Sequence, residues 1–271
     1  MTEDVLWDVG IDGVARLTLN RPEAGNSLTP AMRERVIERL EQVGADQRVR
    51  VVVLGAAGER HFCTGADLSG SNDDSDLPAG APAQPAGSVA RAIARGAQRL
   101  IAAVLDCEKP VIAAVNGTAA GIGCHLAYAC DLVLAAEGGK FVEVFARRGL
   151  VVDGAGAYLL TRLIGPQRAK ELIFFADDLP VADAHRLGLV NKVVPRGELE
   201  AEADNWAKRL AEGPTVALAL GKRLVNQALD GDRGAAFAHE AMAAEINMRS
   251  ADGQEGLRAF MERRAPVFHG W

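Results

Sequence analysis

The chain has 271 residues, 49% of them hydrophobic, and its 30 basic and 36 acidic side chains give a net charge of −6. This length and apolar content predict one large α/β domain, or one domain with a helical appendage. The acidic balance argues against a general nucleic-acid or membrane-surface binder and leaves open only a local basic patch.

Cysteine spacing bears on metal binding, and the N-terminal segment bears on the cellular compartment. The cysteines, which are predicted to be reduced core residues, are Cys63, Cys107, Cys124 and Cys130. None forms the Cys-x-x-Cys pair that a metal site favours, so no metal is predicted. Residues 1–10 carry charges and lack the long apolar stretch of a signal peptide, and the apolar run at 111–115 is too short to span a bilayer. The sequence therefore predicts a cytoplasmic protein.

The first predicted elements are a strand, a helix and a second strand. The apolar stretch 14–19 predicts a strand that ends before Pro22. Pro30 opens a helix that runs toward Ala45, because proline suits the first helical turn. The continuous apolar run 49–54 is typical of a buried strand.

A polar segment then separates these elements from the middle of the chain. Residues 69–87 are rich in Ser, Asp, Pro, Gly and Ala, which predicts a mobile loop rather than a domain linker. A helix at about 89–105 and a buried strand at 111–115 follow, and Asn116-Gly117 predicts a turn.

The rest of the chain continues to alternate. The further predicted elements are a helix start at 121–129, a strand at 132–135, helices at 155–164, 167–175 and 181–187, and a strand at 190–194. From about Glu198 onward the apolar spacing is helical throughout. This order predicts an α/β core over 1–197 and a C-terminal helical segment over 198–271.

Two glycine-rich segments, 62–68 and 116–124, are candidates for chemistry. Glycine lets the backbone approach a ligand closely, and a helix that starts near Ile122 aims free N–H groups at an anion. The alternative is that both segments are tight turns after strands, and spacing alone favours that alternative.

A nucleotide-binding interpretation fails. Gly121-Ile122-Gly123 begins a Gly-x-Gly pattern, but Leu126 stands where the third glycine is needed, and the turn starts several residues after the predicted strand. A phosphate-binding loop is also excluded, because no Gly-Lys-Ser/Thr follows.

Several motifs spread over nearly the whole chain resemble, in order, those of the enoyl-CoA hydratase/isomerase (crotonase) family. They are Asn20-Arg21-Pro22, Asn26-Ser27-Leu28, Phe62 to Leu68, Lys109 to Gly117, Ala129 to Leu132, Gly188 to Asn191, Glu255-Gly256, Ala259-Phe260 and Arg264 to Phe268. The chain looks most like the phenylacetate-pathway isomerases of this family. The resemblance implies an α/β fold with a crotonase-like ββα spiral core, and it implies trimers or dimers of trimers that the C-terminal helices help to assemble.

The resemblance also implies an acyl-CoA site. The thioester oxygen is expected to lie between the backbone N–H groups of Ala66 and Ile122, and the Ile122 side chain must then point away from the ligand. Preorganised donors of this kind stabilise the enolate that forms when a proton leaves the carbon beside the thioester. The residues expected to line the acyl-CoA site are Gly65, Asp67, Leu68, Gly121 and Phe145.

The acid–base groups depart from the hydratase pattern. His125 and Phe145 occupy the positions that resemble the two catalytic glutamates of hydratases. Phe145 cannot transfer a proton, so ordinary hydration is in doubt. Histidine is a common acid–base group in catalysis, but a lone histidine at a helix start is more often structural.

Two acids remain as candidates. Glu143 shares a strand face with Phe145 if that strand is regular, although a solvated surface acid is the favoured interpretation. Asp153 lies where double-bond isomerases of the family often place their acid. The apolar residues 150–152 are expected to raise the pKa of its carboxyl. The alternative for Asp153 is a cap on the helix that follows.

The favoured hypothesis is double-bond isomerisation of an enoyl-CoA, with Asp153 moving the proton and His125 and Glu143 as further catalytic candidates. No cofactor is implied, since CoA enters as part of the substrate, and neither nucleic acid nor membrane is expected as a partner. The alternatives are a hydratase that uses His125 or Glu143, and a non-catalytic acyl-CoA-binding protein.

Overall fold

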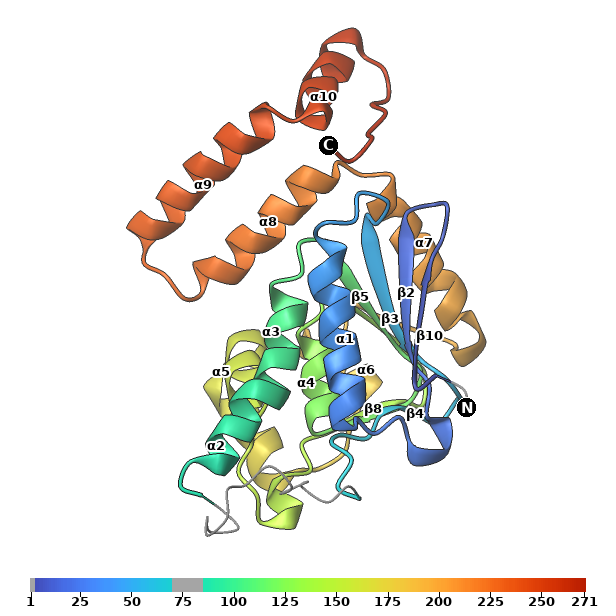
Figure 1. Cartoon of the computed structure of the whole chain (residues 1–271), viewed down its shortest axis with the longest axis vertical. Helices are drawn as coiled ribbons and strands as arrows, with labels where there is room; N and C mark the ends of the chain where they lie inside the picture. The colour runs from blue at the N-terminus through green and yellow to red at the C-terminus, as the bar shows by residue number, and fades with distance from the viewer. Residues whose placement is uncertain (1–2, 70–84) are drawn as a thin grey trace.

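The computed structural model describes residues 3–69 and 85–271, so the loop predicted at 69–87 falls almost entirely outside the described residues. Within them the chain forms a six-stranded sheet and a four-stranded sheet, with helices packed around both (Figure 1).

The core repeats one arrangement, in which two strands are followed by a helix. The first turn consists of β3 (Val51–Ala56), β4 (His61–Cys63) and the helical stretch α2, η3 and α3 (Ser88–Ile93, Ala94–Gln98 and Arg99–Leu105). The second consists of β5 (Val111–Val115), β6 (Thr118–Ala120) and α4 (Ile122–Tyr128), and the third of β7 (Leu132–Ala136), β8 (Lys140–Val142) and α5 (Gly156–Phe175). The predicted ββα spiral is therefore confirmed.

The two strands of each turn enter different sheets. The larger sheet has the order β1-β2-β3-β5-β7-β10, where β1 is Val5–Val9, β2 is Val14–Leu19 and β10 is Lys192–Val194. Its pairs are parallel except β1 with β2. The smaller sheet has the order β4-β6-β8-β9, with β9 (Leu179–Pro180) antiparallel to β8.

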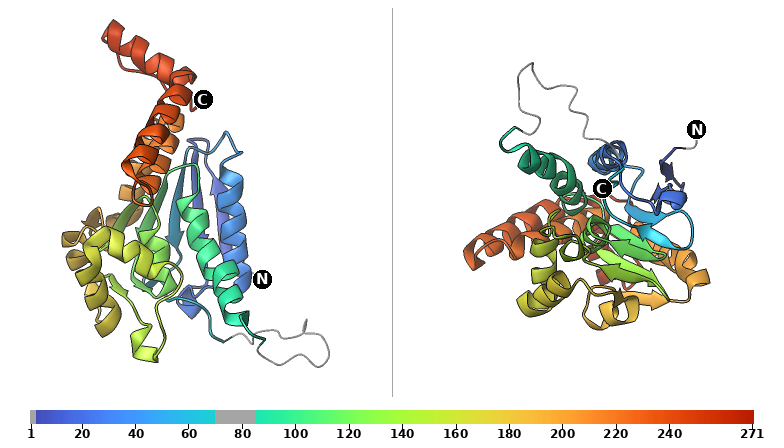
Figure 2. Two further views of the ribbon diagram at one scale, coloured as in Figure 1. Left: turned by 90° about the vertical axis from the view of Figure 1, so that its left-hand side faces the viewer. Right: turned by 90° about the horizontal axis from the view of Figure 1, so that it is seen from below.

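Helices cover both faces of the larger sheet. Helices α1 (Pro30–Val43), α3 and α4 lie on one face, and α7 (Leu199–Ala211) lies on the other (Figures 1 and 2). The apolar side chains of α7 form a second core cluster with the sheet residues that point toward it, such as Ile112 and Leu134. This double cover explains why β5 is apolar at every position.

Three helices, α8 (Thr215–Ala228), α9 (Arg233–Met248) and α10 (Ala251–Glu262), project from the core (Figure 2). A nearly buried ion pair anchors α8, with Lys222 Nζ 2.8 Å from Asp131 Oδ2. The same oxygen accepts a hydrogen bond from the Val111 N–H. Asp131 thus has a structural role, because it joins the start of β5 to the middle of α8.

Several predicted elements are confirmed with shifted bounds. Helix α1 begins at Pro30, and the Thr29 hydroxyl caps it by accepting from the Met32 N–H. The stretch expected as a single helix at 89–105 contains a π-helical turn, η3. Helix α5 spans two predicted helices, and Gly165 has a non-helical conformation where they meet.

Strands β1, β4, β6, β8 and β9 were not predicted, whereas the prediction that the cysteines are reduced core residues is confirmed. Strands β4, β6 and β8 have three residues each, too few to show an alternating pattern. All of the cysteines are free and buried. Among the described residues, no helix is long and apolar enough to cross a membrane.

Candidate active site

The turns that follow β4, β6 and β8 meet at one edge of the smaller sheet. The three strands are parallel neighbours with β6 in the middle, so their C-terminal ends point the same way. Ala66 follows β4, Ile122 opens the helix after β6, and Glu143 directly follows β8. Parallel pairing thus gathers residues that are far apart in the sequence.

Glycine allows the first two turns to touch. A Cβ at Gly123 would lie 2.1 Å from the Cys63 carbonyl oxygen, and a Cβ at Gly65 would lie 3.2 Å from the Ala120 carbonyl oxygen. Gly65 also has a φ of +108°, a backbone conformation that residues with a side chain rarely adopt. Both glycines are therefore required for the backbone of the two segments to run side by side.

The two predicted donor groups are available. Within the described part of the chain, neither the Ala66 N–H nor the Ile122 N–H donates a hydrogen bond. The Ile122 side chain is 4% exposed and packs in the main hydrophobic core. Its backbone N–H is the group that remains for a ligand.

One argument against nucleotide binding was wrong in detail. Strand β6 ends at Ala120, directly before Gly121, so the glycine turn does follow a strand immediately. The other argument stands, because Leu126 is still where a third glycine would be needed.

The turn that carries Ala66 is held by the segment at 21–28. The Leu28 N–H donates to the Gly65 carbonyl at 2.8 Å, and the Asp67 N–H donates to the Leu28 carbonyl at 3.0 Å. Sequence analysis found these motifs only as marks of a resemblance. Their structural role is to hold the first donor in place.

Asp67 also serves this turn rather than an open site. Hydrogen bonds from Ser69 and Arg21 hold the pKa of the Asp67 carboxyl well below its usual range. The Arg21 guanidinium lies 2.8 Å from Asp67 Oδ2. Leu68, predicted beside it as a binding residue, is 71% exposed in the single chain.

His125 and Glu143 form a buried pair, with His125 Nε2 lying 3.0 Å from Glu143 Oε2. Their side chains are 0% and 3% exposed, so the hypothesis of a solvated Glu143 is wrong. The strand argument was also wrong, because β8 ends at Val142. Phe145 nevertheless lies close by, and its ring stacks on His125 with 5.6 Å between ring centroids.

Asp153 lies in a tight turn that leads into α5. The Gly156 N–H donates to the Asp153 carbonyl at 3.0 Å, and Gly154 and Ala155 both have positive φ. Ala155 is the N-cap of α5, and no side chain caps that helix end. The hypothesis that Asp153 is a helix cap is therefore wrong.

The environment of the Asp153 carboxyl favours its protonated form. The side chain is half-buried, and burial raises its pKa, while the positive charges of His125 and Arg33 act in the opposite direction. The predicted direction is confirmed and burial is its main cause, but of the apolar residues expected to supply that burial only Val152 is itself partly buried. Leu150 and Val151 are 55% and 81% exposed and do not enclose the carboxyl.

Asp153 and His125 are brought together by this turn. A Cβ at Gly154 would lie 3.4 Å from His125 Nδ1, and a Cβ at Gly156 would lie 2.3 Å from Nε2. The turn therefore wraps around the imidazole. Arg147, in the short helical turn after Phe145, pairs with Asp178 at 3.0 Å.

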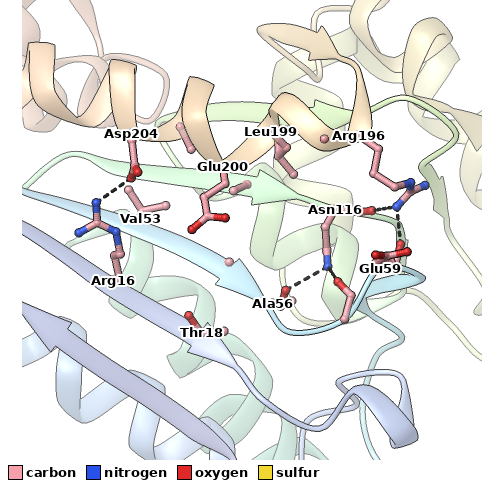
Figure 3. A pocket seen from close by; sticks show the side chains of 15 residues that line it. Arg16, Thr18, Val53, Ala56, Glu59, Asn116, Arg196, Leu199, Glu200 and Asp204 are labelled. Atoms are coloured by element: carbon pink, nitrogen blue, oxygen red, sulfur yellow. Dashed lines mark hydrogen bonds and ion pairs between the residues drawn. The ribbon is translucent and has the colours of Figure 1, made fainter.

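A separate hollow of about 400 Å³ lies on the opposite face of the larger sheet, beside α7 (Figure 3). Its charged groups are largely satisfied within the protein. Arg16 pairs with Asp204 at 2.7 Å, and Arg196 donates to the carbonyls of Glu59 and Asn116. None of the candidate site residues lines it, so the edge of the smaller sheet remains the candidate active site.

Comparison with known proteins identifies the family of the chain. A model of the enoyl-CoA hydratase/isomerase family matches residues 10–270. The chain belongs to the enoyl-CoA hydratase/isomerase family. The fold agrees, because an enoyl-CoA hydratase from Bacillus anthracis superposes with a TM-score of 0.88 at 32% identity, covering 99% of this chain and 100% of that one.

Relatives within the family differ in the reactions for which they are named. The chain is 38% identical to a 1,2-epoxyphenylacetyl-CoA isomerase from Escherichia coli, with 95% of each chain covered. It is 34% identical to a crotonyl-CoA hydratase from Syntrophomonas wolfei, with 94% of each covered. Family membership therefore leaves isomerisation and hydration both open.

The packing of the imidazole generates a prediction about stability. Gly156→Ala places a methyl group against His125 Nε2 and is expected to destabilise the fold by about 1–3 kcal/mol, the usual cost of overpacking. Gly197→Ala is the matched control, because nothing lies within 4 Å of a Cβ there. Thermal melting of both variants gives the measurement. Equal melting temperatures for Gly156→Ala and the wild type would contradict the close contact.

Proposed function

We propose that this family member isomerises enoyl-CoA thioesters, moving a double bond between the 3 and 2 positions, with Asp153 carrying the proton. One observation carries the proposal. Asp153 is a half-buried carboxyl whose side chain makes no hydrogen bond or ion pair within the described residues, whereas His125 and Phe145 occupy the positions resembling the hydratase glutamates.

The chemistry requires one base and a stabilised enolate. Asp153 removes a proton from C2 of a 3-enoyl-CoA, and the electrons pass to the thioester oxygen to give a dienolate. The Ala66 and Ile122 N–H groups hold that oxygen as its charge develops. The protonated Asp153 then returns the proton at C4, which leaves the double bond between C2 and C3.

No oxidation state changes in this reaction, so we propose that it needs neither a redox cofactor nor a metal. A carboxyl with a raised pKa suits the task, because it can take up a proton and return it near neutral pH. The free cysteines support a reducing compartment, and we propose the cytoplasm as the location.

Hydration is the second candidate function. The buried His125–Glu143 pair favours it, because two acid–base groups in contact are what activation of a water molecule requires. Relatives named as hydratases add support. Formation of 3-hydroxyacyl-CoA from a 2-enoyl-CoA would identify this reaction, and binding of acyl-CoA without any turnover would identify a non-catalytic protein.

The role of Asp153 is tested by substitution. Asp153→Asn is expected to lower isomerase turnover on 3-hexenoyl-CoA by about 10²–10⁴, the usual contribution of a positioned acid–base group. Substrate binding should change little, because the donor N–H groups remain. Glu143→Gln should have a much smaller effect at the pH optimum. Near-normal turnover in Asp153→Asn, with folding checked by thermal melting, would refute the assignment.

The oxyanion donors are tested by removing one N–H. Ile122→Pro deletes the donor at a first helical position, where proline is tolerated, and Ile122→Ala keeps the donor and serves as the control. Turnover is expected to fall by roughly 10²–10³ in the proline variant alone. By calorimetry the wild type should bind acetyl-CoA in preference to acetate. Equal binding of both, or equal turnover in both variants, would count against the proposed hole.

We also propose that the C-terminal helices assemble a homotrimer or a dimer of trimers. Exposed apolar side chains gather on α8, α9 and α10, among them Val225, Phe237, Met242, Phe260 and Met261. So large an apolar surface is typical of a surface that another chain covers.

Sedimentation velocity at micromolar concentration tests the assembly. The wild type is expected to sediment as a trimer or a multiple of it. Phe260→Arg with Met261→Arg should shift it toward monomer, because charges are costly in an apolar interface. Ile11→Arg is the control, since Ile11 is a fully exposed apolar residue outside these helices. A wild-type monomer would overturn the proposal.

A further inference from the structure

The His125–Glu143 pair contains two buried atoms that need an explanation. Within the described residues, His125 Nδ1 and Glu143 Oε1 have no hydrogen-bond partner, although both atoms are buried. Buried polar atoms almost always have a partner, and exceptions often mark functional sites. The pair is also held tightly, since Phe145 stacks on one face of the ring and Gly156 leaves just enough room for the other nitrogen.

The free nitrogen faces the turn that carries Asp153. Nδ1 is the ring atom 3.4 Å from the Cβ position of Gly154, the residue directly after Asp153. Nε2 contacts the Glu143 carboxyl. The imidazole therefore joins the buried Glu143 carboxyl to the turn that carries the half-buried Asp153.

The contact between His125 Nε2 and Glu143 Oε2 has the geometry of an ion pair. A buried carboxylate without a cation is strongly unfavourable, so Glu143 needs either a proton of its own or an imidazolium partner. In the imidazolium form both ring nitrogens are donors. Nε2–H then donates to Glu143, and Nδ1–H points toward the Asp153 turn.

We propose that His125 and Glu143 act as one positioning pair, in which Glu143 keeps the imidazole protonated and the imidazolium keeps the Asp153 carboxylate ionised and ready to accept a proton. This proposal rests on the proposed function of Asp153. The other cation facing Asp153 is Arg33, on α1. The pair does not itself meet the substrate, because neither of its side chains reaches the surface while Asp153 does in part.

The charges determine the direction in which loss of the pair shifts the pKa of Asp153. Burial raises the pKa of Asp153, and the positive charge of His125 lowers it. Removing that charge lets the pKa rise, so a higher pH is needed before Asp153 can act as a base. The acid limb of the pH profile must then move to higher pH. A purely structural role would instead lower activity at every pH and leave the limb in place.

The experiment is the pH profile of kcat/KM on 3-hexenoyl-CoA. Glu143→Gln keeps a hydrogen-bonding side chain and removes the charge that stabilises the imidazolium. The acid limb is expected to move upward by about one pH unit or more, the usual effect of a neighbouring opposite charge. Turnover should recover above the new limb, with KM unchanged. Glu245→Gln is the matched control and should leave the limb in place, because Glu245 is an exposed acid whose one ion-pair partner among residues 3–69 and 85–271 is Arg249.

Two further measurements distinguish the proposed charge effect from a folding defect. The double variant His125→Gln with Glu143→Gln forms a neutral hydrogen-bonded pair and should show the same shifted limb as Glu143→Gln alone, because both act through one charge. In the wild type, nitrogen NMR of the labelled imidazole, assigned by comparison with His125→Gln, should find both ring nitrogens of His125 protonated at neutral pH.

The outcomes separate the two proposals. A neutral His125, or an acid limb that coincides in Glu143→Gln and the wild type, overturns the positioning pair and leaves Asp153 as the base. A loss of about 100-fold at every pH in Glu143→Gln, with the acid limb in place, means a structural role or direct proton transfer by the pair, and either one overturns the positioning pair. Full turnover in Asp153→Asn overturns both proposals.

Discussion

Parallel pairing of β4, β6 and β8 sets the position of the donors and of the buried acid–base pair in the candidate site. Because the three strands run the same way, the turns that follow them meet at one edge of the smaller sheet. The β4 turn brings Ala66, the β6 turn brings Ile122 and His125, and the β8 turn brings Glu143. Each strand is only three residues long, so small errors in register would separate the donors from the acid–base groups.

Close approach of backbones is the constraint that this pairing imposes on the sequence. Gly123 must lack a side chain because the Cys63 carbonyl occupies that space, and Gly156 must lack one because His125 does. The first glycine keeps two donor turns in contact, and the second admits an imidazole beneath the Asp153 turn. The positions of these glycines are thus set by close packing within the candidate site as well as by the turns.

Long, regular features were predictable from the sequence, and short or long-range ones were not. Helix α1 and strand β5 follow from an N-terminal Pro and a continuous apolar run. Strands β4, β6 and β8 have no pattern of their own and are stabilised by their neighbours. The ββα spiral came from resemblance, since the spacing of apolar residues does not say which sheet a strand joins.

The candidate site was predictable as a set of residues but not as an arrangement. His125, Glu143 and Asp153 were each identified, yet nothing in the sequence indicated that Glu143 is buried against His125. That contact joins residues 18 positions apart across two turns of the spiral, and only the pairing of β6 with β8 creates it. The surroundings of Asp153 were misjudged for the same reason, since the groups that influence its charge come from α1 and α4 rather than from adjacent residues.

The departure from two glutamates is chemically coherent once these contacts are known. Burial raises the pKa of the Asp153 carboxyl, and the positive charges of His125 and Arg33 lower it, so Asp153 combines two opposed influences. In the isomerisation that we propose, burial favours the protonated acid that delivers a proton at C4, while a positive charge on His125 favours the carboxylate that first removes a proton from C2. A carboxyl that shuttles a proton must be able to exist both protonated and ionised near neutral pH. Two opposed influences on the pKa of one side chain, Asp153, meet this requirement. Ala155, held with a positive φ beside it, indicates that the chain accepts backbone strain to keep the Asp153 turn closed around the imidazole.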